Sequence, residues 1–436
     1  MDNLTIGLIC TGVTLVLIAL RFPIGVVLGA VALVGISWMT SPRVAWGMIS
    51  ATPFDFIGQW ELSAAPMFLL MGYIATSAEL TRGMFDALRL FLARLPGGLA
   101  ISSVGACAFF AAASGSSVAT AAAMSRIAVP EMLKYRYDKG LATGTIAASG
   151  TLGSLIPPSV LLILYGVNAE VSVGQLFMAG FIPGLVSALL YGVMIVIRVK
   201  VSPALAGPVQ ERATRAEKVA ALREVWPLPT LILLVLGGIF TGVFSPTEAG
   251  ALGAAFATAI ALWRRSLTRA RFREAVVKTL EGTASIFLIL IGSVFFTRFL
   301  ALSGLPTAFS DAVLSVSAEP WWILFAVAVI YILLGMLIDS IGLLLLTLPL
   351  VLPLAQGAGM DLIWFGIIVI KLLEIGLVTP PIGLNVYVIK GALGNIVTLP
   401  QVFRGVAWFI VMDFAALFLI IAVPALSLWL PSLAYR

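Results

Sequence analysis

The chain has 436 residues, of which 61% are hydrophobic and only 11% are charged, and it contains no histidine. Soluble domains carry about 25% charged residues, so this composition indicates a polytopic membrane protein and excludes a soluble globular domain, imidazole-based catalysis and histidine metal ligation. The formal net charge of +6 does not indicate nucleic-acid binding, and the two cysteines, Cys10 and Cys107, lie in apolar segments and indicate neither a disulfide framework nor a metal site.

Apolar segments predict ten transmembrane spans, each long enough to cross the hydrocarbon core. They cover residues 4–20, 23–40, 61–80, 140–168, 175–198, 226–244, 247–263, 283–303, 361–389 and 406–430. The polar segment 201–224 is expected to form a cytoplasmic linker or a surface helix. Segments 43–58, 82–95 and 267–281 look amphipathic, and they are either arms that lie in the membrane interface or ordinary connecting loops.

Two further apolar stretches, 97–136 and 321–358, are too long for one span, and each has a polar break in its middle. The first break is Ser114-Gly115-Ser116-Ser117 and the second is Asp339-Ser340. We interpret both stretches as re-entrant helical hairpins, which enter and leave the membrane on the same side. Non-helical backbone at such depth is tolerated only inside protein or beside a water-filled cavity.

The same unit occurs twice along the chain. A step of 223 positions carries Pro157-Pro158 onto Pro380-Pro381, and the same step carries Ser116-Ser117 onto Asp339-Ser340. Each half is expected to hold an odd number of spans, so we predict two inverted repeats. In membrane proteins, paired Gly/Pro-interrupted segments in two halves point to a transport site.

The distribution of Lys and Arg predicts a periplasmic N-terminus. With that orientation the cytoplasmic side receives the basic segments 198–223 and 264–278, whereas the outer loops hold mainly acidic residues such as Glu170 and Asp361. The first hairpin then opens from the cytoplasm and the second from the outside. We expect no cleavable signal peptide, because Arg21 follows the first apolar segment and does not precede it.

The polar breaks supply oxygen atoms inside the membrane. Gly115 permits a tight reversal, and the serine hydroxyls with the freed carbonyls suit a small hard cation; for any single serine the alternative is a helix cap. A carboxylate at membrane depth, such as that of Asp339, is a functional hypothesis by default. It could bind Na⁺, carry a proton or pair with a cation, and the alternative is an N-cap, although Ser or Asn would cap without burying charge.

Each Pro-Pro segment removes two backbone donors, so the carbonyls one turn earlier lose their partners. Polar and small residues flank both breaks: Thr151, Gly153 and Ser154 in the first half, and Thr379, Gly383 and Asn385 in the second. Unwound carbonyls beside hydroxyls make an oxygen cage suited to Na⁺. A packed proline kink is the alternative for one copy, but the recurrence of the break in both copies disfavours it.

Three charged residues within the apolar segments keep more than one interpretation open. Arg298 lies in the span 283–303, where it could receive a substrate carboxylate, pair with Asp339 or extend to the interface. Lys371 and Glu374 lie three positions apart on one helix face and are expected to form an intrahelical pair. A coupling role for that pair stays open.

These motifs together resemble a known family. The hairpin Ser114-Gly-Ser-Ser, the run Gly150-Thr-Leu-Gly-Ser-Leu-Ile-Pro-Pro-Ser and the run Thr379-Pro-Pro-Ile-Gly-Leu-Asn are similar to those of the large membrane subunit of a tripartite ATP-independent periplasmic (TRAP) transporter. The resemblance covers nearly the whole chain. It implies an all-α elevator transporter of the ion-transporter superfamily in the bacterial inner membrane, which is not an enzyme and imports an organic acid together with Na⁺. It also implies two partners, a periplasmic substrate-binding protein and a small membrane subunit that is a separate chain.

The resemblance further implies cation sites between the hairpin tips and the broken helices. Carried onto this sequence, the Na⁺ candidates are Ser114, Gly115, Ser116, Ser117, Gly150, Thr151, Gly153, Gly335, Asp339, Ser340, Thr379, Pro380 and Gly383. The substrate candidates, in a polar cleft between the two halves, are Arg298, Ser154, Pro157, Asp339 and Asn385.

The expected division of the chain into domains follows the repeats. Residues 97–200 and 320–395 are expected to form a moving transport domain, residues 1–96, 225–319 and 396–436 a scaffold, and residues 201–224 the linker.

Two alternative functions remain. The first is a stand-alone Na⁺- or H⁺-coupled carboxylate symporter that needs no binding protein. The second is an intramembrane protease using Asp339 or a serine, which is disfavoured because no second buried aspartate in a matching motif and no histidine base are present.

Overall fold

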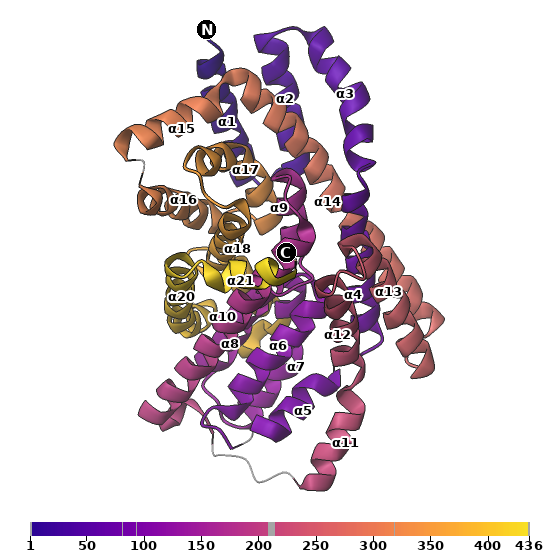
Figure 1. Cartoon of the computed structure of the whole chain (residues 1–436). Coiled ribbons are helices and arrows are strands. Elements are labelled where there is room, and N and C mark those ends of the chain that lie inside the picture. The colour runs from indigo at the N-terminus through magenta and orange to yellow at the C-terminus, as the bar shows by residue number, and fades with distance from the viewer. Residues whose placement is uncertain (1, 81, 93, 208–213, 318, 435–436) are drawn as a thin grey trace.

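The computed structural model describes residues 2–80, 82–92, 94–207, 214–317 and 319–434 (Figure 1). Every regular element among these residues is a helix, so the predicted all-α class is confirmed. Residues 208–213 of the expected linker lie outside the described residues. The α-helices in chain order are α1 (Asn3–Ala19), α2 (Ile24–Met39), α3 (Pro42–Ile57), α4 (Ala64–Ser77), α5 (Arg82–Leu92), α6 (Gly98–Ser114), α7 (Ser117–Lys134), α8 (Lys139–Leu155), α9 (Val160–Asn168), α10 (Val173–Val201), α11 (Arg215–Val225), α12 (Pro227–Phe240), α13 (Pro246–Trp263), α14 (Arg269–Ser303), α15 (Leu305–Val316), α16 (Pro320–Gly335), α17 (Ser340–Gly357), α18 (Leu362–Val378), α19 (Leu384–Leu393), α20 (Leu399–Ala422) and α21 (Ala425–Ala434).

The order of these helices repeats at the step found in the sequence. Helices α7 and α17 begin at Ser117 and Ser340, which are 223 positions apart, and α8 and α18 begin at Lys139 and Leu362, again 223 apart. The breaks recur as well, because α8–α9 and α18–α19 are each interrupted at a Pro-Pro pair with a cis peptide bond. The two halves of the chain therefore have the same element order.

Each stretch interpreted as a hairpin is a pair of packed helices, α6 with α7 and α16 with α17, separated at the polar break. The backbone reverses in the first pair at Gly115, whose φ of +61° is strained for any residue with a side chain. The broken span Lys139–Asn168 is enclosed by protein over its full apolar window. The non-helical backbone at the first Pro-Pro break therefore lies where neighbouring helices can satisfy it, whereas Pro380 and Pro381 at the second break are exposed.

The number of membrane spans differs from the prediction. Five helices are long and apolar enough to cross a membrane, and the bent pair α11 and α12 makes a sixth if it is taken as one span. Two of the ten expected spans, 4–20 and 23–40, are the shorter apolar helices α1 and α2, of 17 and 16 residues. A helix of 17 residues is about 25 Å long, which is shorter than the hydrocarbon core of about 30 Å.

Two predicted boundaries were wrong. The amphipathic segment 267–281 and the span 283–303 are one continuous helix, α14, of 35 residues. Only Gly282 separates the two segments, and a single glycine costs about 1 kcal/mol in a helix without ending it. Conversely, the span 406–430 is two helices, because Pro424 disfavours the helical conformation at Val423 and α20 ends before it.

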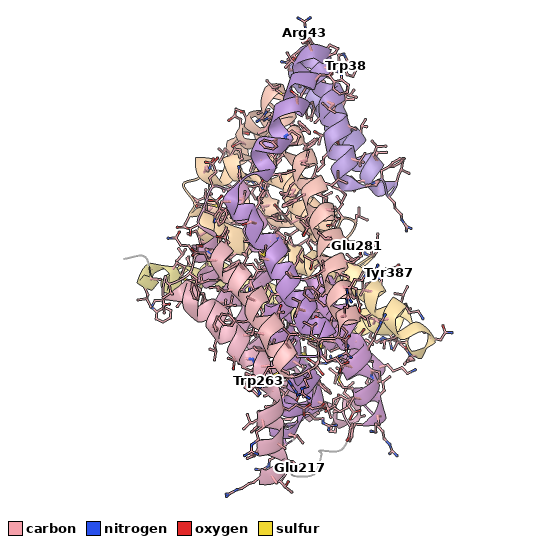
Figure 2. The ribbon with its side chains drawn as sticks, turned by 90° about the vertical axis from the view of Figure 1, so that its right-hand side faces the viewer. Trp38, Arg43, Glu217, Trp263, Glu281 and Tyr387 are labelled. Carbon is pink, nitrogen blue, oxygen red and sulfur yellow. The ribbon has the colours of Figure 1, made fainter. Side chains whose placement is uncertain are left out.

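The helices form two packed groups. The first, which we call the hairpin body, consists of α6–α10 and α16–α20, with α8 packed against α6, α7, α18 and α20. The second, the long-helix body, consists of α1–α4 and α12–α14, in which α14 packs along α2 and α4 and α13 packs along α4. Figure 2 shows the long axis of the molecule, with Trp38 near one end and Trp263 toward the other.

Small residues let the helices of the hairpin body approach closely. A Cβ atom added at Gly405 of α20 would lie 1.8 Å from the carbonyl oxygen of Gly140 in α8, and one added at Gly144 would lie 2.5 Å from the carbonyl oxygen of Gly405. Transmembrane helices commonly pack through such small residues four positions apart. The crossing of α8 and α20 therefore depends on these three glycines.

We predict that Gly405→Ala lowers the free energy of unfolding of the purified protein by about 1–3 kcal/mol. The added methyl group would overlap the backbone of α8, which cannot shift without moving the whole helix. The matched control is Gly237→Ala in α12, where an added Cβ would meet nothing within 4 Å. Thermal unfolding in detergent measures both. Equal unfolding temperatures for the two variants would contradict this account of the crossing.

Candidate functional site

The two hairpin turns meet at one cavity of about 610 Å³. Ser114–Ser117 line it from the first turn, and Asp339 and Ser340 line it from the second. The opposite wall comes from the long-helix body, through residues such as Tyr73 of α4 and Ser285 of α14. The cavity thus lies where the two halves of the chain and the two bodies come together.

The first turn is held by its own backbone and by α9. A Cβ at Gly115 would lie 3.1 Å from the carbonyl oxygen of Pro158, so a side chain there would crowd the Pro-Pro break. Ser116 is the N-cap of α7, and its hydroxyl accepts a hydrogen bond from the backbone N–H of Ala119 at 3.3 Å. The capping interpretation is therefore correct for Ser116.

The hydroxyl of Ser117 joins the first turn to the broken helix α8. It lies 2.6 Å from the hydroxyl of Ser154 and donates to the carbonyl oxygen of Thr151 at 3.3 Å. The hydroxyl of Ser114 lies 2.9 Å from that of Thr120. Hydroxyls and a carbonyl therefore converge at this turn in numbers that capping alone does not require.

Glycines on α8 let α7 lie against the same region. A Cβ at Gly150 would lie 3.0 Å from the Cβ of Ala121, and one at Gly153 would lie 3.3 Å from the backbone of Ser116. Neither glycine is among the residues that line the cavity. They lie directly behind the first turn and set its distance from α8.

Asp339 caps the second turn. Its Oδ2 atom accepts hydrogen bonds from the backbone N–H groups of Ile341 and Gly342, each at 3.1 Å. The N-cap interpretation therefore holds, and Asp339 is also the one carboxylate among the described residues that line the cavity. The hydroxyl of the adjacent Ser340 is buried and has no hydrogen-bond partner within the described part of the chain.

The second Pro-Pro break contributes less to the cavity. Leu377 and Leu384 line it, whereas Thr379, Pro380 and Gly383 do not. The hydroxyl of Thr379 donates back to the carbonyl oxygen of Ile375 at 2.6 Å. At the other side of α18, Gly335 makes a close backbone contact with Gly376. A Cβ added at Gly335 would lie 3.1 Å from the Cα of Gly376.

The structure places only some of the substrate candidates at the cavity. Ser154 and Asp339 line the cavity, but Pro157, Asn385 and Arg298 do not. Asn385 is buried and donates to the carbonyl oxygen of Ala147 at 3.2 Å. The Oδ1 atom of Asn385 accepts no hydrogen bond from the described residues.

Two basic residues on the cavity wall were missed as site residues. Arg126 of α7 and Lys278 of α14 both line it, and Arg126 also lines a neighbouring cavity of about 690 Å³ with Arg89, Glu131 and Lys134. The sequence shows both as members of basic clusters. It contains no local signal that places these two residues at the cavity, because their position depends on how α7 and α14 are packed by other helices on either side of it.

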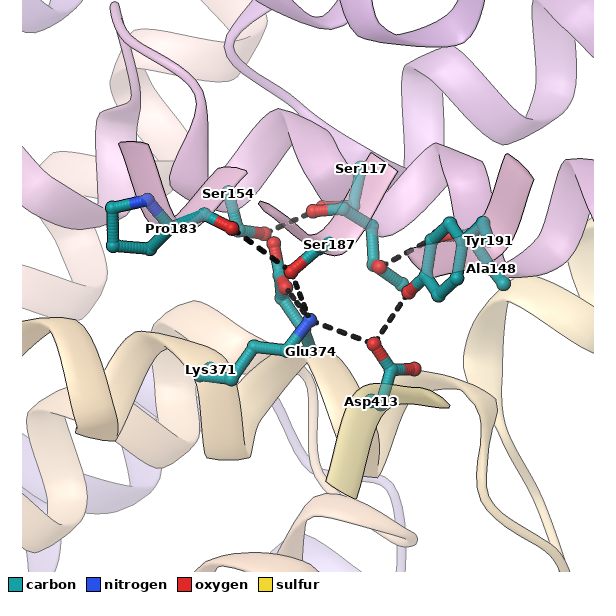
Figure 3. Close-up of polar contacts among 10 residues, drawn as sticks. Ser117, Ala148, Ser154, Pro183, Ser187, Tyr191, Lys371, Glu374 and Asp413 are labelled. Carbon is teal, nitrogen blue, oxygen red and sulfur yellow. Dashed lines mark hydrogen bonds and ion pairs between the residues drawn. The ribbon is translucent and has the colours of Figure 1, made fainter. Parts of the chain in front are cut away.

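A buried charged cluster lies behind the cavity, inside the hairpin body (Figure 3). The predicted pair is confirmed, since the Nζ atom of Lys371 lies 3.0 Å from Oε2 of Glu374. The same Nζ lies 2.6 Å from Oδ1 of Asp413 in α20 and donates to the hydroxyl of Ser187 in α10 at 3.1 Å. The hydroxyl of Tyr191 in α10 also donates to Oδ1 of Asp413. The sequence signal for Asp413 was its position inside an expected span, where a carboxylate is functional by default.

Known proteins similar to this chain include transporter subunits. The family model described as "Tripartite ATP-independent periplasmic transporter, DctM component" matches residues 11–426. The C4-dicarboxylate TRAP transporter large permease protein DctM of Pseudomonas aeruginosa is 34% identical over 87% of this chain and 88% of that protein. The sialic acid TRAP transporter large permease protein SiaM of Vibrio cholerae is 33% identical over 86% of this chain and 87% of that protein.

One solved structure with a similar fold is that of MtrF from Neisseria gonorrhoeae, whose title describes a class of antimetabolite efflux pumps. The TM-score is 0.59 over 88% of this chain and 84% of that chain, at 14% sequence identity. At this identity the likeness shows the fold alone.

The buried cluster gives a stability prediction. Lys371→Met should lower the free energy of unfolding by about 3–5 kcal/mol, because it leaves a buried carboxylate without its cation. Lys278→Met is the control, since the ion pair of Lys278 with Glu274 is half exposed and should contribute little to stability. Thermal unfolding of both variants in detergent provides the measurement, and a Lys371→Met protein as stable as the control would contradict the prediction.

Proposed function

The chain belongs to the DctM component family of the tripartite ATP-independent periplasmic transporters, and on that premise we propose that it is the membrane subunit that imports an organic acid together with Na⁺. A periplasmic binding protein delivers the acid, and a separate small membrane subunit completes the transporter. The protein resides in the bacterial inner membrane with its N-terminus in the periplasm. The observation that best supports this proposal is that both hairpin turns line one cavity.

The first proposed Na⁺ site lies between the first turn and α8. Its ligands would come from Ser114–Ser117 together with the backbone of Gly150, Thr151 and Gly153. Oxygen ligands suit a small hard cation, and unwound backbone in broken helices commonly coordinates Na⁺ in transporters. The convergence of the Ser117 hydroxyl on Ser154 and on the Thr151 carbonyl supports this position.

The second proposed site uses the matching positions of the other half. Asp339 and Ser340 would supply ligands, with carbonyls from Gly335 and from the segment Thr379–Gly383. The unpartnered hydroxyl of Ser340 supports this choice, because a buried polar atom without a partner is costly unless a ligand satisfies it. The bound cations would lower the cost of bringing a substrate carboxylate into the membrane.

We propose an elevator movement in which the hairpin body slides against the long-helix body. The close approach of the two bodies supports a sliding surface: a Cβ at Gly72 of α4 would lie 2.6 Å from the carbonyl oxygen of Ala113 in α6. We assign α20 to the moving body, although the sequence placed residues 396–436 in the scaffold, because α20 packs against α8, α10, α18 and α19.

Inverted repeats are part of the same proposal. Figure 1 shows α2 and α17 toward one end of the molecule, and their counterparts at the step of 223, α13 and α7, toward the other. The neighbouring cavity lined by Arg89 and Lys134 would open to the cytoplasm, because basic residues gather on that side. The chain would then be in an inward-facing state, with Arg126 between the two cavities.

We predict that Asp339→Asn folds with ordinary stability but loses most Na⁺-driven uptake. Asparagine caps a helix as well as aspartate does, so this variant removes the charge and keeps the turn. Uptake would be measured in proteoliposomes that hold the chain with its small subunit and its loaded binding protein. The control is Asp311→Ala on the exposed face of α15. Unchanged uptake and Na⁺ dependence in Asp339→Asn would refute the role of Asp339, and full uptake without the binding protein would favour a stand-alone symporter.

A second prediction is that Arg126, which lines the cavity, binds the carboxylate of the substrate. Because hydrogen bonds to a charged group contribute about 1.5–3 kcal/mol, Arg126→Gln should raise the KM for the acid about 10- to 100-fold. Arg298→Gln is the matched control, since Arg298 does not line the cavity. The same uptake assay separates KM from the maximal rate. A raised KM in Arg298→Gln together with an unchanged KM in Arg126→Gln would contradict this prediction and would assign the contact with the substrate carboxylate to Arg298.

A further inference from the structure

The proposed transport cycle assigns no role to the charged cluster of Lys371, Glu374 and Asp413. These three side chains are completely buried, and they come from α18 and α20. The polar side chains that face them are Ser187 and Tyr191 of α10, as Figure 3 shows. The cluster therefore lies in the interior of the hairpin body, away from water and lipid.

Its charges do not balance when all three groups are ionised. One ammonium group stands against two carboxylates, which leaves one negative charge in a region that no solvent reaches. An uncompensated charge in such a place is expensive, and buried groups commonly change protonation to avoid it. A neutral lysine would worsen the imbalance, so the missing positive charge must be added to a carboxylate.

The contacts distinguish the two carboxylates. Oδ1 of Asp413 accepts from the Lys371 ammonium at 2.6 Å and from the Tyr191 hydroxyl, and two strong donors on one oxygen favour the ionised form. Glu374 accepts only from Lys371, at 3.0 Å, and its Oε1 atom has no partner among the described residues. Glu374 is therefore the weaker acceptor and the natural position for a proton.

A metal cation suits this position poorly. The Lys371 ammonium already lies 3.0 Å from Glu374 and 2.6 Å from Asp413, and it would repel a second cation bound between them. Na⁺ also needs several oxygen ligands, whereas the unpartnered carboxylate oxygens of the described cluster are Oε1 of Glu374 and Oδ2 of Asp413. A proton needs only one of these atoms.

We propose that the cluster is a proton-binding site and that the hairpin body carries Glu374 as a neutral carboxylic acid. This state does not depend on the proposed function. The site is close enough to the cavity to matter for transport, because Leu377, which lines the cavity, follows Glu374 by three positions on α18, about 4.5 Å along the helix. On α8, Ser154 lines the cavity and follows Thr151, which lies beside the Tyr191 hydroxyl, by the same three positions.

The test compares Glu374→Gln and Asp413→Asn in the purified full-length chain by infrared spectroscopy and thermal unfolding. Glutamine has the shape and charge of a protonated glutamate, so Glu374→Gln should keep the unfolding temperature of the unaltered protein and lose one carbonyl band of a protonated carboxyl group. Asp413→Asn leaves Glu374 as the remaining anion for Lys371, so the same band should disappear as Glu374 ionises. Asp339→Asn, in the cavity, should leave that band in place.

Three outcomes would overturn the proposal. The first is a Glu374→Gln protein that fails to fold or unfolds at a much lower temperature, since an ionised pair would then have been lost. The second is a protonated-carboxyl band that Glu374→Gln leaves unchanged. The third is a stabilisation of the unaltered protein by NaCl over KCl that Glu374→Gln alone removes, which would assign a sodium ion to the cluster. None of these readouts requires transport activity, so failure of the proposed function would leave them interpretable.

Discussion

The interaction on which the rest of the structure depends is the contact of the Ser117 hydroxyl with α8. A helix that breaks in the membrane leaves carbonyl groups without partners, and lipid cannot satisfy them. Pro158 has no N–H for the Ser154 carbonyl, and the Ser159 hydroxyl donates to that carbonyl instead, while Ser117 of the hairpin turn contacts the Thr151 carbonyl and the Ser154 hydroxyl beside the break. This contact forms the side of the cavity that Ser114–Ser117 and Ser154 line.

The two halves of the chain hold their hairpin turns with different side-chain groups. The first turn uses hydroxyls, and the second uses the carboxylate of Asp339, which binds two backbone N–H groups at the position that corresponds to Ser116. The interior also diverges, because Lys371 and Glu374 stand where the first half has Ala148 and Thr151. The backbone breaks thus recur in both halves while the polar groups around them differ, which is the expected result when geometry constrains the fold more strictly than side-chain identity does.

Local sequence signals predicted those helix ends that are determined by residues at the end itself. Gly115 and the serines around it placed the first hairpin turn correctly from the sequence, whereas the break at Pro424 was missed because the last span was drawn through that proline. Helix α14 was predicted as two pieces because its first part is amphipathic and its second part apolar, although the single Gly282 between them does not end a helix. Asp413 lies 42 positions from Lys371, and no spacing rule connects them. The choice between Arg126 and Arg298 likewise depends on which side of each helix faces the cavity, and that is a property of the assembled bundle.

The central claim is that the two hairpin turns and the broken helices together hold sodium. Equilibrium binding of radioactive Na⁺ to the purified chain tests it most directly, with the Ser117→Ala and Ser340→Ala variants compared separately and together. The account predicts saturable binding that each substitution weakens and that the double substitution abolishes, while the variants keep the helical content of the unaltered protein. Saturable Na⁺ binding that survives both substitutions at full affinity would contradict it.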